Sequence, residues 1–207
     1  GNLLADAAGQ ALQRLITFFP QVIDGVLAIK DLAEATGSSV EMISALDDVA
    51  RRSGDSLQVV EGVIIKFNAA LKEADGKNGI SQALQALGLS AKELRDIDPA
   101  EALQRAAQAL DGFADDGNRA RLTQELFGKG VKDAATFLRD LAEAGKLSAK
   151  VTTEQAEEVD KFNKEIASLQ TNIVGLARDV TFELLPAINQ WLEKIRGADF
   201  SKFFNVF

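Results

Sequence analysis

The sequence contains no cysteine and no histidine, and these absences remove many of the side chains that carry chemistry at neutral pH. There can be no disulfide and no thiolate nucleophile, and the commonest general base and zinc ligand are missing. Proline is scarce, with three residues in 207. No stretch predicts a membrane span, because the most apolar one, residues 11–29, holds Arg14, Pro20 and Asp24. We therefore expect a protein that is not an enzyme, without cofactor, metal or catalytic residues.

Positive charge is also in short supply. The chain has 23 Lys and Arg against 31 Asp and Glu, which gives a formal net charge of -8. Such a balance argues against nucleic-acid recognition by a basic face. Two small basic clusters, Arg51–Arg52 and Arg119–Arg121, have acidic neighbours that dilute them. We interpret both clusters as solvated helix faces.

The chain does contain many apolar residues, and they have helical spacing. Hydrophobic residues make up 46% of the sequence. They recur at steps of three and four, and no convincing run alternates with period two. The pattern predicts an all-α fold. We expect several short helices, punctuated by glycine stops, packed with one long kinked C-terminal helix.

The longest pattern runs over residues 152–195. Thr152 and Gln155 have the spacing of a capping box at its start. An apolar seam at coiled-coil spacing follows, made by Val159, Phe162, Ile166, Leu169, Ile173, Leu176 and Val180. Pro186 removes a backbone donor and clashes one turn back, so we expect a kink near residues 182–185.

The apolar seam must be buried against another helix, and two partners remain as alternatives. As a free coiled coil its residues suit a parallel dimer. Residues 59–71 or 137–141 of the same chain could cover it instead, and we favour this intramolecular packing. Self-association would then use the wide apolar face at residues 22–32 and the aromatic end at residues 200–207. The partners expected on this ground are other copies of the chain.

Short helices separated by sharp stops fill the region before the long helix. Glycines at 37, 54, 88, 128 and 145 each follow a helical pattern. Residues 36–41 and 53–58 repeat the same pattern at an offset of 17: a helix stop, a capping residue and the start of the next helix. In the first copy, Ser38 and Glu41 are expected to form a capping box. Asp98 before Pro99 is the strongest helix start in the chain.

These signals divide the chain into four parts. We expect apolar N-terminal helices over residues 1–36, a short-helix module over 37–150, a long helix over 151–196 and an aromatic tail over 197–207. Because the aromatic tail has little to bury against, we expect the natural chain to continue past Phe207.

The remaining candidates for chemistry have simpler structural interpretations. Carboxylates are paired at Asp47–Asp48, Asp115–Asp116 and Glu157–Glu158, but adjacent helical residues point about 100° apart rather than across a cleft. We interpret them as solvated surface charge. Gly128–Lys129–Gly130 lacks the full spacing of a phosphate loop and is interpreted as a helix stop. Trp191 is expected to pack in a core or an interface.

A series of short motifs in a fixed order resembles one protein family, the tail tape measure proteins of long-tailed bacteriophages and prophages. The motifs are Leu32–Glu41, Ser44–Leu46, Ala50–Gly54, Leu87–Ser90, Leu126–Gly130, Phe162–Asn163 and Leu184–Pro186. Each is weak alone, and their joint order over residues 21–196 is specific. The chain departs from the family in a shortened loop after Gly130.

The resemblance implies a structural role in the virion. Proteins of this family fill the lumen of the tail tube and set the length of the tail, after assembly in the host cytoplasm. The implied partners are further copies in a ring or trimer, the tail tube, tail-tip and tail chaperone proteins, and the host envelope at infection. The alternatives are a cell-wall-degrading or a membrane-active tail component.

Overall fold

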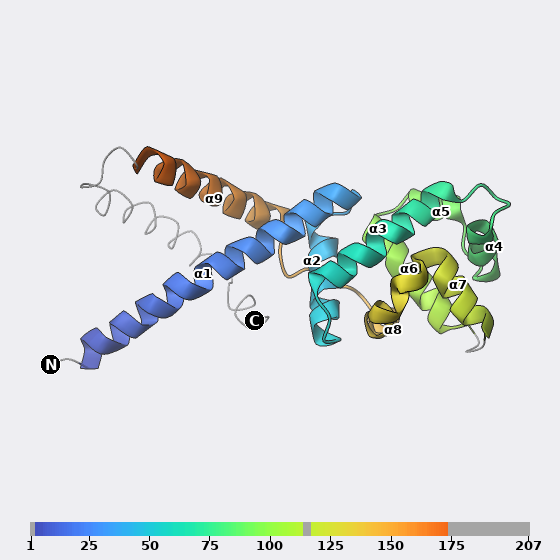
Figure 1. Ribbon diagram of the computed structural model, residues 1–207, viewed down its shortest axis with the longest axis horizontal. Coiled ribbons are helices and arrows are strands. Elements are labelled where there is room, and N and C mark those ends of the chain that lie inside the picture. Colours follow the sequence, from blue (N-terminus) through green and yellow to red (C-terminus); the bar gives the residue numbers. More distant parts are fainter. Residues whose placement is uncertain (1–2, 114–116, 174–207) are drawn as a thin grey trace. The chain divides into compact units, whose positions relative to one another are not determined.

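The computed structural model describes residues 3–113 and 117–173, and this part of the chain is all helical, as predicted (Figure 1). The elements are α1 Leu3–Thr36, α2 Val40–Arg52, α3 Leu57–Glu73, α4 Gly79–Ala86, α5 Ala91–Arg95, α6 Pro99–Asp111, α7 Gly117–Phe127, the 3-10 helix η1 Lys129–Ala134, α8 Ala135–Glu143 and α9 Thr153–Ile173. None of the described residues forms a strand.

The chain divides into two compact units. Unit 1 comprises residues 1–27 and 154–207, and unit 2 comprises residues 28–153. Helix α1 starts in unit 1 and ends in unit 2, and it continues through Pro20 without a break. Proline lacks an amide hydrogen, so the continuous helix has one hydrogen bond fewer there.

Unit 2 is organised around α3. This helix packs against α2, α4, α5, α6, α7 and η1, and α8 packs against α2, α6 and η1 (Figure 1). Phe67 of α3 and Phe127 of α7 are fully buried, with ring centroids 5.4 Å apart. Other large, fully buried side chains are Ile43, Leu46, Ile64, Leu84, Leu103, Leu122, Leu126, Phe137 and Leu141. Most of these core residues carry the three- and four-residue spacing seen in the sequence, because that spacing places them on one face of each helix.

The predicted glycine stops form corners of unit 2. Gly37 has φ 76° and Gly54 has φ 82°, a backbone conformation that side chains with a Cβ rarely adopt. After α2, the amide of Asp55 donates to the carbonyl of Ala50 at 2.8 Å, which closes the helix end in the manner of a Schellman motif. Helix α1 also ends at a glycine of positive φ, but its hydrogen bonds differ: the amide of Gly37 donates to the carbonyl of Ala33 at 2.9 Å, and the amide of Ser38 donates to the Thr36 hydroxyl at 3.4 Å.

Two helix starts in unit 2 have local features worth noting. Residues 129–134 form a 3-10 helix, which α8 follows directly over residues 135–143. Helix α4 starts at Gly79, because Asn78 caps it by accepting the amide of Ser81 at 2.9 Å.

The long helix starts as predicted. Helix α9 begins at Thr153, one residue after the expected cap, and is described through Ile173. Val159, the first residue of the seam, is buried, and Phe162 is half-buried. The kink expected near residues 182–185, Trp191 and the aromatic tail lie outside the described residues.

The wide apolar face expected at residues 22–32 is largely covered. Ile23, Val26, Ile29 and Leu32 are buried, and Val22 is half-buried. The structure thus buries within the chain most of the face from which self-association was expected.

Candidate functional site

A cluster of polar side chains that join distant segments of unit 2 lies around the first two turns of α2, and we call it the α2 junction. It consists of Ser38, Ser39, Glu41 and Ser44 near the start of α2, Asp98 before α6, and the residues that lead into α9. Each contact joins segments that are far apart in the sequence. The junction therefore holds the starts of three helices in register.

One carboxylate caps two helices at the junction. Asp98 accepts the amide of Ala100 in α6 at 2.9 Å through one oxygen. Its other oxygen accepts both the amide of Ser39, at 2.8 Å, and the Ser39 hydroxyl, at 3.0 Å. Ser39 in turn caps α2 by accepting the amide of Met42 at 3.3 Å. Negative charge is stabilised at a helix N-terminus, and Asp98 lies at two of them.

The capping box expected between Ser38 and Glu41 is wrong. Ser39 is the capping residue of α2, and Ser38 is buried one position earlier. The Ser38 hydroxyl accepts the amide of Ala100 at 3.1 Å, so it supports the start of α6. Glu41 turns away from its own helix start and bonds to Thr153. Both side chains bond to residues far away in the sequence, because there they accept amides at the starts of other helices that have no partner within their own helix.

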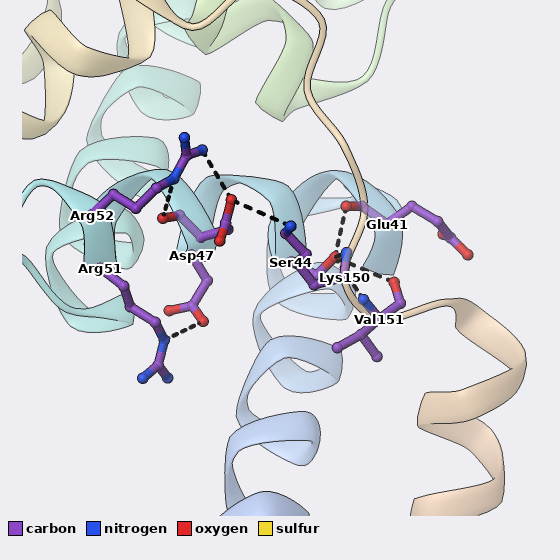
Figure 2. Close-up of polar contacts among 8 residues, drawn as sticks. Glu41, Ser44, Asp47, Arg51, Arg52, Lys150 and Val151 are labelled. Carbon is purple, nitrogen blue, oxygen red and sulfur yellow. Dashed lines mark hydrogen bonds and ion pairs between the residues drawn. The ribbon is translucent and has the colours of Figure 1, made fainter. Parts of the chain in front are cut away.

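The connection from α8 to α9, residues 144–152, is held against α2 and α6, and we call it the strap. Figure 2 shows Lys150 and Val151 of the strap beside Ser44 of α2. The Ser44 hydroxyl accepts the amides of Lys150 and Val151, each at 3.1 Å. It also donates toward the carbonyls of Glu41, at 2.9 Å, and Val151, at 3.2 Å. At the other end of the strap, Gln104 donates to the carbonyls of residues 144 and 145.

Glu41 holds the first residue of α9. Its carboxylate accepts the amide of Thr153 at 2.6 Å and the Thr153 hydroxyl at 3.0 Å. Partial burial is the largest single influence and opposes ionisation, but the hydrogen bonds from Thr153 and from the backbone of Glu41 together outweigh it and hold the pKa of Glu41 below its ordinary value. The charged form of Glu41 therefore stabilises the contact with Thr153.

The paired carboxylates Asp47 and Asp48 do not converge on a cleft. Asp47 accepts from Arg51 at 2.7 Å, and Asp48 lies 2.9 Å from Arg52 and 3.9 Å from Lys150. The expectation of solvated charge is wrong for Asp47, whose residue is 4% exposed and whose second oxygen has no hydrogen-bond partner. The Arg51–Arg52 cluster is thereby matched by acidic groups one turn back.

The other candidates from the sequence lie apart from the junction. Glu157 and Glu158 are exposed on α9, and Asp115–Asp116 lie outside the described residues. Gly128 has φ 76° and ends α7 just before η1, so Gly128–Lys129–Gly130 is a helix stop, as interpreted.

A shallow groove of about 290 Å³ lies between α6, α7, η1 and α8. Its floor is apolar, with Leu110, Val131 and Leu138. Arg119 and Arg139 stand at its edge, but Asp111 and Asp140 lie 3.3 Å from them. Carboxylates thus match two of the three basic side chains that line the groove, and Lys132 is the third.

Among the described residues, no group of carboxylates is placed to hold a metal ion. No helix in the same part of the chain is long and apolar enough to cross a membrane. Sequence reasoning singled out Asp98 as a cap, but it missed the roles of Ser38, Glu41 and Ser44. Ser44 drew notice only as part of a family-like motif, since nothing local indicates a partner 107 residues away.

Comparison of the chain with protein-family models, with curated proteins and with solved structures gave no match.

Proposed function

We propose that this chain is a structural component of a bacteriophage tail, a segment of a tape measure protein that sets tail length. In this role it occupies the lumen of the tail tube in the virion and leaves ahead of the DNA at infection. The proposal rests on the resemblance of the ordered motifs in residues 21–196 to that family.

The observation that best supports the proposal is where these motifs lie in the fold. Leu32–Glu41 contains the end of α1 and the start of α2, and Ala50–Gly54 contains the end of α2. Leu87–Ser90 separates α4 from α5, and Leu126–Gly130 separates α7 from η1. Gly88 and Gly128, like Gly37 and Gly54, have positive φ. Four of the seven motifs behind the resemblance thus lie at helix ends, where they shape the scaffold, and this suits a structural protein.

Unit 2 has a particular place in such a ruler. A ruler measures best as an unbroken rod, and the corners of unit 2 interrupt the helices. We propose that unit 2 is a folded module within a longer ruler, at an attachment point, and that the long helix with its kink near residues 182–185 is part of the rod.

The proposed partners follow from the tail. They are the tube, tail-tip and tail chaperone proteins, the host envelope at infection, and further copies of this chain in a ring or trimer. A cylindrical lumen imposes rotational symmetry on what fills it. Sedimentation of the whole chain against a form lacking residues 1–35 and 197–207 tests the self-association. The whole chain is expected to associate at high concentration, and the trimmed form to stay monomeric.

Tail length tests the function directly. Two in-frame deletions are made in the gene that encodes this chain, and tails are measured by electron microscopy. Removing two heptads of the long helix, residues 159–172, is expected to shorten the tail by about 20 Å, because a helix rises about 1.5 Å per residue. Removing residues 37–150 is expected to shorten it by far less than the about 170 Å of a rod that long.

Normal tail length after both deletions would contradict the proposal. Clearing of a peptidoglycan suspension by the purified chain would favour the cell-wall-degrading alternative. Leakage from liposomes at neutral or acidic pH would favour the membrane-active one. No contact among the described residues favours either alternative, since the carboxylates Asp47 and Asp48 pair with their own arginines.

A further inference from the structure

The strap differs from the rest of unit 2 in the kind of contact that holds it. Of residues 144–152, Val151 alone is fully buried, at 3% exposure, and the others are half-buried or exposed. The other contacts that hold the strap in place are polar, and they come from Gln104, Ser44 and Asp48. Glu41 adds a hydrogen bond to the adjoining Thr153. The core of unit 2, by contrast, consists of apolar side chains from the helices around α3.

Opening the strap leaves few polar groups without a partner. The Ser44 hydroxyl is also within hydrogen-bond reach of the Glu41 carbonyl, at 2.9 Å, so it keeps an acceptor inside its own helix when Val151 leaves. The carboxylate of Glu41 is half-exposed and is hydrated once Thr153 leaves. A buried polar group that loses its partner is the main cost of breaking such contacts, and here that cost is small.

We propose that the strap is a latch that opens locally, releasing residues 146–153 from α2 while the core of unit 2 stays folded. The inference does not depend on the tape measure proposal, because it follows from the contacts alone. A connection the length of the strap reaches about 30 Å when fully extended. Opening therefore lets the connection extend without unfolding the helices of unit 2.

The latch has three reporter amides. Those of Lys150, Val151 and Thr153 donate to the side chains of Ser44 and Glu41 rather than to helix carbonyls. Hydrogen exchange of the whole chain, followed residue by residue at increasing sub-denaturing urea, separates local from global opening. A local opening exposes little surface, so exchange of these three amides is expected to be nearly independent of urea. Core amides, such as that of Leu103, are expected to accelerate steeply with urea.

Two substitutions and one control sharpen the test. Ser44→Ala removes the acceptor of two reporter amides, and Glu41→Gln removes the charge that holds Thr153. Each is expected to accelerate exchange of its reporter amides roughly tenfold and to leave the core amides unchanged. Ser53→Ala is the matched control, because that hydroxyl donates to Val49 in the same helix and does not touch the strap.

The outcomes are distinct. The latch is supported if exchange of the reporter amides is independent of urea and is accelerated by Ser44→Ala but not by Ser53→Ala. Reporter amides that exchange at the rate and urea dependence of the core overturn it, because the strap would then open only when unit 2 unfolds. Equal acceleration of reporter and core amides in both Ser44→Ala and Glu41→Gln overturns it as well.

Discussion

Asp98 is half-buried, and we expect it to be the most sensitive polar position in unit 2, because its carboxylate serves two helices. Replacing a capping residue by alanine typically costs about 1 kcal/mol. Asp98→Ala removes the acceptor of the Ser39 amide and hydroxyl at the start of α2, and one acceptor of the Ala100 amide in α6. Ser38 still accepts the Ala100 amide, at 3.1 Å, which softens the loss there. We expect Asp98→Ala to lower the free energy of unfolding by about 2 kcal/mol.

The measurement is a urea titration of the whole chain followed by far-ultraviolet circular dichroism. Ser90→Ala is the control, since Ser90 caps only α5 through one long contact, 3.4 Å to the Glu93 amide. It is expected to cost about 0.5 kcal/mol, the low end for a cap. Asp98→Asn keeps an acceptor and is expected to fall between the two. Equal losses for Asp98→Ala and Ser90→Ala would refute the shared cap.

A double-mutant cycle isolates the long-range part of this effect. Ser39→Ala removes the hydroxyl that donates to Asp98 and caps α2. If the two residues act together, the double variant loses less stability than the sum of the single variants, by about 0.5 kcal/mol or more. Strict additivity would mean that the hydroxyl contact contributes nothing measurable, which would leave the Ser39 amide as the link from Asp98 to α2.

Three further predictions concern the core, the latch and the seam. Phe67→Ala is expected to cost about 3–5 kcal/mol in the same titration, because Phe67 is fully buried against Phe127, and an unchanged midpoint would contradict this. The pKa of Glu41 is lowered when Thr153 is bound, so the charged carboxylate stabilises this contact. Protection of the Thr153 amide against hydrogen exchange, corrected for intrinsic exchange, should be full above the ordinary carboxyl pKa. It should fall as the pH drops through the lowered pKa of Glu41. Glu41→Gln is expected to remove this pH dependence, and a dependence that survives the substitution would contradict the assignment to Glu41. Ile173→Asp is expected to abolish cooperative melting or self-association, and unchanged melting and sedimentation would place the seam in solvent.

Much of unit 2 could be predicted from the sequence because its helix ends are set locally. The stop at Gly54 needs only a residue that tolerates positive φ, and the start at Asp98–Pro99 needs only an acceptor and a fixed φ. The buried faces of α2 and α3 follow from three- and four-residue spacing for the same reason. These are properties of a few neighbouring residues, so the order of short helices is visible in the sequence.

The α2 junction was decided by tertiary structure. Ser38 and Glu41 have the local spacing of a capping box, but they bond to Ala100 and Thr153, which lie 62 and 112 residues away. Each side chain has several amides it could accept, and the choice depends on which helix starts the fold brings near. The burial of Asp47 has the same origin, since an isolated helix would leave that carboxylate in water. The sequence by itself thus determined where most helices begin and end, whereas packing alone decided which polar groups join them, because hydrogen bonds between distant segments carry no local signature.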